Sequence, residues 1–407
     1  MAGKKRMTKA QRRRRRKMLV IAKLSAAGLV LIGVIVLVIV LISSCSKKNA
    51  GKAKEAESQS IAAEQESSSL AEAQAAALTH ETTAAPKKYS DAEYAAAKVN
   101  EMGSVPILMY HRIYDMKNSE TDYIGGNVDA DGYNRTSEAF EADLEQYYEW
   151  GYRCVRLDDY LDGNVNVEFG CSPVIITFDD GDRDAVINGF DANGDPIFTD
   201  ECALSVLERV KERHPDFNVT ATFFLNDSLF RNGREKDEQL MHWMIDHGYD
   251  IGNHTKDHPN LSELTGAEIE EQVGFVYNLL DEIIPGEYVN IVALPYGIPV
   301  DTSADSKYDM LFAGTYEGKS YTTKATLLCS WTFEDSIFSG NVDKTYIRRI
   351  RGYDNGGEDW DIEYNFSILN NGYRYISDGN PDTVVVPDTE IEPGAPDGRE
   401  VIIYKTE

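Results

Sequence analysis

The chain has 407 residues, 42% hydrophobic and 27% charged, which is enough for one large globular domain with appendages. It carries 41 basic and 68 acidic residues, and ten of the basic ones lie within residues 1–17. Without that tail the balance is 31 to 68, a net charge of −37. Such an acidic chain argues against nucleic acid as a partner of the main part. No obligate protein partner is evident either.

The chain begins with a basic tail followed by an apolar run. Residues 1–17 contain no acidic residue, and residues 24–42 are almost wholly apolar. At about 1.5 Å per residue, a helical run of this length crosses a bilayer core. Because basic flanks stay in the cytoplasm, we predict a single-pass transmembrane helix over residues 18–43, with the rest of the chain extracellular at the cell membrane.

Two other N-terminal arrangements remain open. A cleavable signal peptide is one, although its apolar region is usually shorter, about 7–15 residues. The sequence Ile42-Ser43-Ser44-Cys45 is similar to a bacterial lipoprotein processing site, which would make a lipidated Cys45 the anchor. Both a membrane helix and a lipidated cysteine would tether the main domain to the outer side of the cytoplasmic membrane.

Residues 44–100 are rich in Ala, Glu, Ser, Gln and Lys. A segment with so few bulky apolar residues cannot bury a core, so we predict a flexible or partly helical linker. The composition changes near Val105, where the first strand of the main domain is expected.

Strand-like and helix-like patterns then alternate along the chain. Predicted strands begin at 105 and cover 153–157, 174–178, 219–225, 249–252, 290–294, 310–315 and 326–332. Predicted helices cover 137–150, 202–213, 237–247 and 267–284. This alternation is typical of parallel βαβ units, and about seven strands predict an α/β fold that is a distorted or incomplete barrel.

Two clusters of polar residues follow predicted strands. The apolar run 173–176 leads into Thr-Phe-Asp-Asp-Gly at 177–181, so two neighbouring carboxylates stand at a strand's end. Two adjacent carboxylates repel unless a cation or a proton compensates one of them. His254 and His258 follow another short apolar segment at a spacing that lets both imidazoles bind one ion. Each cluster alone could be an ordinary surface loop, but the pair points to a site.

Together these two motifs resemble the first two motifs of the polysaccharide deacetylases, the NodB-homology domain of carbohydrate esterase family four. The resemblance covers about residues 105–353. It implies an incomplete (β/α) barrel with both motifs on its C-terminal face. It also implies that Asp179 is the general base and that Asp180, His254 and His258 bind a divalent metal.

The chemistry of the residue types agrees with that assignment. Two imidazoles and one carboxylate are typical of catalytic zinc, because three protein ligands leave a coordination position for water. The metal makes that water acidic, and a neighbouring carboxylate that is not a ligand, here Asp179, can take its proton. Zinc is the expected ion, although cobalt, nickel or iron suit the same ligands.

Pro295-Tyr296-Gly297 matches the end of the family's third motif, which is usually Arg-x-Pro-Tyr-Gly. The resemblance implies that Pro295 and Tyr296 contact the substrate, with the Tyr296 backbone N–H holding the oxyanion. Ala293 stands where the family has the arginine that orients the base. Arg112 and Arg183 are the candidates to replace it.

The late motifs of the family are changed. No histidine follows His258, and residues 346–351 occupy the place of the Leu-x-His motif whose histidine is the general acid. We therefore assign the general acid to His111, because it ends the first strand; the alternative is a histidine satisfied by local hydrogen bonds. Trp331 is the predicted wall of the acetyl pocket.

The predicted function is a metal-dependent hydrolase that removes N-acetyl groups from an extracellular amino-sugar polysaccharide, either peptidoglycan or poly-N-acetylglucosamine. An O-acetyl esterase and a non-catalytic glycan-binding module are the alternatives. The predicted organisation is a cytoplasmic tail, a membrane helix, a linker, a deacetylase domain and an extension of unassigned role, over residues 1–17, 18–43, 44–100, 101–355 and 356–407.

Overall fold

The computed structural model describes residues 87–165 and 167–406. Within these residues the centre is an eight-stranded sheet in which all neighbouring strands are parallel. Seven strands follow the order β13-β10-β9-β8-β5-β1-β14, and β4 pairs with β5 beside this path. They are β1 Ile107–Tyr110, β4 Tyr152–Cys154, β5 Ser172–Asp179, β8 Thr222–Leu225, β9 Asp250–Asn253, β10 Ile291–Ala293, β13 Ala325–Leu327 and β14 Ile350–Arg351.

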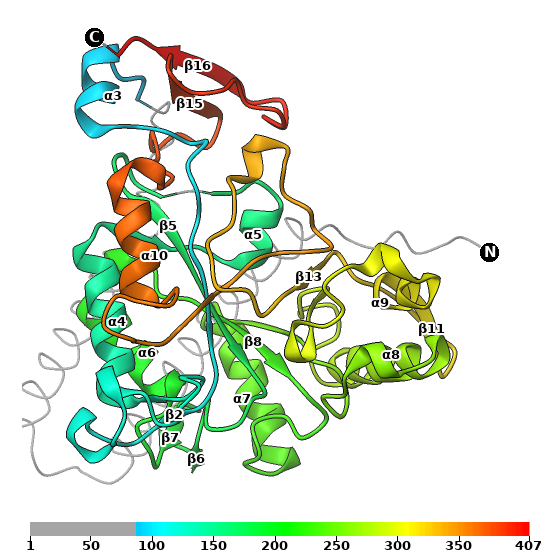
Figure 1. The fold of residues 1–407 in the computed structure, drawn as a ribbon. Helices are drawn as coiled ribbons and strands as arrows, with labels where there is room; N and C mark the ends of the chain where they lie inside the picture. Colours follow the sequence, from blue (N-terminus) through cyan, green and yellow to red (C-terminus); the bar gives the residue numbers. More distant parts are fainter. Residues whose placement is uncertain (1–86, 166, 407) are drawn as a thin grey trace, which may run out of the picture. The chain divides into compact units, whose positions relative to one another are not determined.

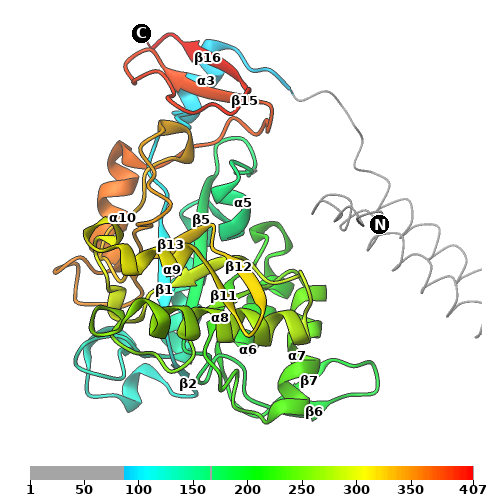
Figure 2. The ribbon, with the colours of Figure 1, turned by 90° about the vertical axis from the view of Figure 1, so that its right-hand side faces the viewer.

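Helices surround the sheet (Figures 1 and 2). The long ones each connect two strands of the sheet, as parallel pairing requires. They are α4 Ser137–Glu149, α6 Ala203–Arg213, α7 Arg234–Asp246 and α8 Gly266–Ile283, with shorter α5 Leu157–Leu161, α9 Asp309–Phe312 and α10 Ile362–Ile368. The predicted α/β fold, an incomplete barrel of about seven parallel strands, is thus confirmed within the described residues.

Strand β5 has the character of a strand covered on both faces. All eight of its residues are buried, as expected for a near-continuous apolar run in a parallel sheet. The Phe178 ring stacks on Phe223 of β8 at a centroid distance of 5.0 Å and on Tyr110 of β1 at 5.7 Å. These contacts anchor the strand that carries the two aspartates.

The two edges of the sheet approach each other. Ile347, just before β14, pairs in parallel with Leu327 of β13, and the Ile347 N–H donates to Thr326 O at 3.0 Å. On its other side, β14 pairs with β1. Residues 347–351 therefore connect β13 to β1, although no strand was predicted there.

Three other strand predictions need correction. Residues 310–315, predicted as a strand of the barrel, begin in α9 and continue into β11 Ala313–Tyr316, which forms an antiparallel hairpin with β12 Lys319–Thr322 outside the sheet. The strand predicted at 153–157 ends at Cys154, and Leu157 already begins α5. The strand predicted at 326–332 ends at Leu327. Short apolar runs suit helices and strands equally, which explains these errors.

The N- and C-terminal parts of the described chain fold together. Helix α3 Asp91–Ala97 packs against the parallel pair β15 Thr383–Pro387 and β16 Glu400–Tyr404, with Tyr94 of α3 2% exposed beside the Tyr404 ring. We call residues 87–104 and 374–406 the terminal module. Residues 87–100 were predicted to end a linker, but buried aromatic contacts make them part of this module.

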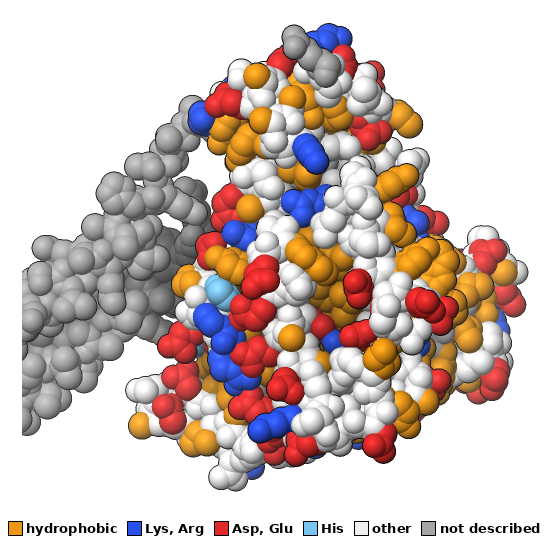
Figure 3. Space-filling model, turned by 60° about the vertical axis from the view of Figure 1, so that its left-hand side comes forward, with side chains coloured by type: hydrophobic (Ala, Val, Ile, Leu, Met, Phe, Trp, Pro, Cys, Tyr) orange, Lys and Arg blue, Asp and Glu red, His pale blue; other side chains and the backbone are white. Residues whose placement is uncertain are grey.

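Two further pairs of short strands lie outside the sheet: β2 Ile113–Tyr114 with β3 Arg135–Thr136, and β6 Ile187–Phe190 with β7 Pro196–Phe198. Acidic and basic side chains are intermixed on the face shown in Figure 3. Glu141 of α4, for example, accepts hydrogen bonds from Arg209 and Arg213 of α6. The predicted membrane helix and Cys45 lie outside the described residues, and no helix within those residues is long and apolar enough to span a bilayer.

Candidate active site and metal centre

Strand β5 delivers both aspartates of the first motif. Asp179 is its last residue and is fully buried, while Asp180 leaves the strand with a left-handed backbone, φ 78°. Gly181 continues the turn at φ 70°, and a Cβ there would lie 2.4 Å from the carbonyl oxygen of Leu229. Only glycine fits at this position. The tight turn separates the two carboxylates, so that each meets different partners.

The histidine loop begins where β9 ends. His254 follows the strand directly, and both Thr255 and His258 have positive φ, 65° and 53°. Two buried asparagines hold this loop. Asn226 Nδ2 donates to the carbonyl oxygens of His254 and Thr255, both at 3.0 Å, and Asn253 Oδ1 accepts from the Thr255 N–H at 2.8 Å. Backbone strain of this kind persists only where the surroundings enforce it, and it clusters at functional sites.

Asp180, His254 and His258 converge as predicted. One ligand atom of each lies within 4.8 Å of the others. Asp180 Oδ1 is 3.4 Å from His254 Nε2 and 3.7 Å from His258 Nε2. Ligand atoms around a tetrahedral zinc ion are about 3.4 Å apart, so two of the three separations already fit an ion.

The hydrogen bonding of His254 also fits a ligand. Its Nδ1 donates to Ala293 O at 2.9 Å, which leaves the buried Nε2 as a lone pair without a hydrogen-bond partner. This lone pair faces a carboxylate oxygen of Asp180, so a cation or a proton must lie between them. Burial lowers the pKa of His254, but Asp179 and Asp180 outweigh burial and raise that pKa above its ordinary value.

Asp179 is paired with an arginine that the sequence did not reveal. Arg349 Nη1 donates to Asp179 Oδ1 at 2.8 Å, and Nη2 donates to Oδ2 at 2.7 Å. Both side chains are fully buried, and the guanidinium also donates to Thr177 Oγ1 and Leu328 O. Burial would raise the pKa of Asp179, but Arg349, together with His254 and His111, outweighs burial and lowers that pKa. The carboxylate is therefore ionised and fixed in orientation.

Arg349 has the position expected of the arginine that is absent at position 293, because it pairs with Asp179. The two arginines considered from the sequence are both engaged elsewhere, Arg112 with Asp182 at 2.8 Å and Arg183 with Asp200 at 2.6 Å. The interpretation that either replaces the missing arginine was wrong. Arg349 lies far along the chain in the segment that bridges the sheet edges, so only tertiary structure brings it to β5.

The carboxylates and histidines line one cavity of about 300 Å³. The lining residues are His111, Arg112, Tyr133, Asn134, Asp179, Asp180, His254, His258, Tyr296 and Cys329. His111 follows β1, its Nδ1 is buried without a partner, and its ring meets Tyr133 edge-on. Burial lowers the pKa of His111, although the nearby carboxylates oppose it. A protonated ring there would be a stronger acid than ordinary histidine.

The third motif forms a 3-10 turn after β10. Pro295 is buried beneath it, and Tyr296 has φ 57° with a side chain that is 61% exposed and packs edge-on against His258 at 4.6 Å. Trp331 is not among the residues that line the cavity. It is 52% exposed, so it does not form a pocket wall in this structure.

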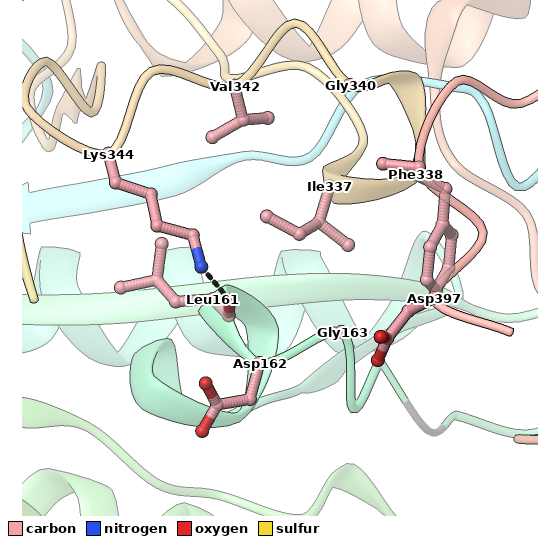
Figure 4. Close-up of a pocket in the computed structure, with 10 residues that line it drawn as sticks. Leu161, Asp162, Gly163, Ile337, Phe338, Gly340, Val342, Lys344 and Asp397 are labelled. Atoms are coloured by element: carbon pink, nitrogen blue, oxygen red, sulfur yellow. Dashed lines mark hydrogen bonds between the residues drawn. The ribbon is translucent and has the colours of Figure 1, made fainter.

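A second cavity, of about 440 Å³, lies between α5 and residues 337–344 (Figure 4). Lys344 Nζ donates to the carbonyl oxygen of Leu161 at 2.8 Å, and Asp162 pairs with Lys324 at 2.5 Å. Its charged groups thus already have partners, and none of the predicted site residues lies there. The smaller polar cavity is the better candidate for a catalytic centre.

Three residues that hold the site escaped the sequence analysis: Arg349, Asn226 and Asn253. Asn253 directly precedes His254, and its place at the end of a predicted strand was the one available signal. An arginine flanked by isoleucines, as in residues 347–350, is a weaker signal of burial with a partner.

Comparison with known proteins supports the resemblance. Residues 166–311 match the sequence model of the family described as Polysaccharide deacetylase. A chitooligosaccharide deacetylase of Sinorhizobium fredii is 30% identical over 140 residues, which cover 34% of this chain and 54% of that protein. One from Azorhizobium caulinodans is 31% identical over 126 residues, covering 31% and 49%. The chain thus spans about half the length of these curated relatives.

Among solved structures, the Streptococcus pyogenes deacetylase PplD in complex with acetate aligns with a TM-score of 0.42 at 18% identity, over 61% of this chain and 92% of that one. The peptidoglycan deacetylase PdaC from Bacillus subtilis aligns with a TM-score of 0.21 at 23% identity, over 33% and 52%. Residues 166–311 are thus similar to polysaccharide deacetylases, and the family resemblance of the two motifs is confirmed.

Proposed function

We propose that this protein is a metal-dependent hydrolase that removes N-acetyl groups from an amino-sugar polysaccharide. One observation carries the proposal: an ionised, arginine-held Asp179 lies in the same cavity as the convergent trio Asp180, His254 and His258. The names of the relatives, chitooligosaccharide and peptidoglycan deacetylases, favour a polymer of N-acetylated amino sugars as substrate.

Hydrolysis of an N-acetyl group consumes one water and releases acetate and an amine. Asp180, His254 and His258 would hold a divalent cation, with zinc as the first choice, and this ion would supply Lewis-acid chemistry. Asp179 accepts a proton from the water, and Arg349 keeps both carboxylate oxygens in place for this. The Tyr296 backbone N–H stabilises the oxyanion, and His111 donates a proton to the leaving amine nitrogen.

Arg349 also bears on the alternatives. A non-catalytic glycan-binding module would have no use for a buried arginine that orients a carboxylate beside three metal-ligand side chains. The paired Asp179 therefore favours an enzyme. An O-acetyl esterase would use the same groups, and the choice of acetylated polymer tests it.

For its location we propose an extracellular position on the cell membrane. The support is the sequence of residues 1–43, a basic tail followed by an apolar run. Lipidation at Cys45 is the alternative anchor. Peptidoglycan or a secreted poly-N-acetylglucosamine would be within reach of either.

The decisive experiment is acetate release by purified protein that has been stripped of metal and reloaded with zinc, cobalt or nickel. We expect acetate and new free amines from N-acetylglucosamine oligomers or peptidoglycan after reloading, and none from the stripped protein or from Asp180→Asn. Acetate without new amines from an O-acetylated glycan would instead establish the esterase. No acetate from any of these substrates contradicts the proposal.

The role of His111 needs its own variant. We expect His111→Gln to bind zinc as the wild type does and to lose about 10²-fold or more in kcat, a typical loss for a general acid. Zinc content by mass spectrometry and kcat are the measurements. Unchanged turnover would remove His111 from the mechanism.

A further inference from the structure

Two tryptophans are exposed on loops that follow β13 and β14, the two edge strands of the sheet. Trp331, after β13, is 52% exposed, and Trp360, after β14, is 47% exposed. Because both strands run parallel to β5, these loops emerge at the end of the sheet that carries Asp179. Tryptophan is enriched at binding interfaces relative to the rest of a protein surface.

One buried side chain fixes both loops. Asn365 of α10 is fully buried, and its Nδ2 donates to the carbonyl oxygen of Trp331 at 3.1 Å and to that of Trp360 at 2.7 Å. The main chains of the two tryptophans thus both accept a hydrogen bond from Asn365 Nδ2, although they are far apart in sequence. Their rings are exposed while their backbones are anchored.

The backbone at Trp360 is strained. Asp359 and Trp360 have φ values of 51° and 65°, a region that bulky residues rarely adopt. The strain is maintained by the Tyr353 hydroxyl, which donates to Asp359 O, and by Asp361, whose carboxylate accepts from the backbone of Asn355 and Gly357. Strain of this kind at an exposed aromatic residue indicates function rather than stability.

Both loops also connect to the cavity. Cys329, two residues before Trp331, lines it. On the other side, the Arg351 guanidinium lies over the rings of Tyr353 and Tyr133, and Tyr133 lines the cavity. The segments that carry both tryptophans thus reach the cavity, although neither tryptophan lines it.

We propose that Trp331 and Trp360 form an aromatic platform on which further sugar rings of the polysaccharide stack beside the cavity. The inference rests on the proposed function. A pyranose ring has an apolar C–H face that packs on an aromatic ring, while its hydroxyl groups remain in water. Tryptophan suits this because it offers a large rigid surface at a low cost in conformational entropy. The platform would make the enzyme selective for chains over single sugars.

Trp360→Gly and Trp331→Ala test this. Glycine adopts positive φ without strain, so Trp360→Gly removes the ring without endangering the fold. With zinc-loaded protein, we expect the double variant to raise KM for an N-acetylglucosamine hexamer about tenfold, equivalent to about 1.4 kcal/mol, with kcat unchanged. KM for the dimer should change less than about twofold. Tyr373→Ala is the matched control, because Tyr373 is an aromatic residue that is 62% exposed and whose carbonyl oxygen accepts from the Ser104 N–H ahead of β1.

Binding of the same hexamer to metal-free protein, measured by calorimetry, separates this inference from the proposed function. Weaker binding by the tryptophan variants, with wild-type affinity in Tyr373→Ala, supports the platform even if no acetate is ever released. Unchanged hexamer affinity and KM overturn the platform even if the enzyme is active. An equal loss on dimer and hexamer also overturns it, because a platform beyond the cavity acts only on the longer chain.

Discussion

Two buried carboxyl groups at different places in the molecule differ in their ionisation near neutral pH. Asp179, in the cavity, is 0% exposed and forms two hydrogen bonds with Arg349, which lowers its pKa despite burial. Glu101, in the terminal module, is 2% exposed, and burial, together with the nearby Asp378 carboxylate, raises its pKa to about 8. Burial alone therefore does not decide whether a carboxylate is ionised. The presence of a matched cation does.

The partners of Glu101 explain the contrast. Its carboxylate accepts from the Val385 N–H at 2.7 Å and the Tyr375 hydroxyl at 2.9 Å. These neutral donors join the N-terminal segment to the C-terminal strands, but they compensate a buried negative charge only in part. Glu101 is suited to a structural role, while Asp179 remains a charged group that can accept a proton.

The largest expected effect comes from breaking the ionic pair. Arg349→Met leaves Asp179 buried without a cation, and we expect the free energy of unfolding to fall by about 3–5 kcal/mol. Acetate release should fall by at least about 10²-fold, because the base loses its orientation. Urea unfolding and initial rates measure the two effects.

Adding Asp179→Asn to Arg349→Met sharpens the same comparison. With both charges removed, most of the lost stability should return, whereas activity should not. An unchanged urea midpoint in the single variant would mean that the pair does not have the electrostatic role assigned to it here.

The next effect concerns Glu101 and pH. An acid whose folded pKa, about 8, exceeds its unfolded value, 4.5, adds stability below pH 4.5 that is lost as the pH rises towards 8. Glu101→Gln mimics the protonated form, so we expect it to match the wild type near pH 4 and to be more stable by about 3 kcal/mol near pH 7. Unfolding free energies across this range provide the measurement. A difference that does not vary with pH would contradict the raised pKa.

The smallest expected effect concerns Asn226, which positions the histidine loop through neutral hydrogen bonds and not through a charge pair. Asn226→Ala removes the amide that holds the carbonyl oxygens of His254 and Thr255, and we expect zinc affinity to weaken about tenfold without loss of the fold. Zinc titration of Asn226→Ala against the exposed-loop control Asn193→Ala measures it. Equal affinities in the two variants would show that the histidine loop keeps its geometry without Asn226.

The motifs predicted from the sequence consist of residues close together in the chain, whereas the residues found only in the structure lie far along the chain from the groups that they hold. Asp179 and Asp180 are adjacent in the chain, and His254 and His258 are four residues apart, so short-range patterns revealed both groups. Arg349 is 170 residues from Asp179. Its strand β14 has only two residues, too short for any periodic pattern to predict it.

The same distinction applies to Trp331 and to the terminal module. Trp331 was predicted to be a wall of the acetyl pocket, but its ring is exposed and its main chain is held by Asn365, which comes from a helix with no motif. Residues 87–100 have the composition of a linker, yet Tyr94 and Val99 are buried because β15 and β16 provide a surface for them. Local composition does not report such distant partners.

From the order of residues alone come the α/β class, the four polar residues at the strand ends and the expectation of a metal site, because strand-end position and ligand type are local properties. Only the tertiary structure determines which arginine holds the base, which asparagines hold the histidine loop and why the tryptophans are exposed. Each of these depends on contacts between segments that are distant in the chain, since a buried charge or amide is stabilised by whichever partner the fold brings to it.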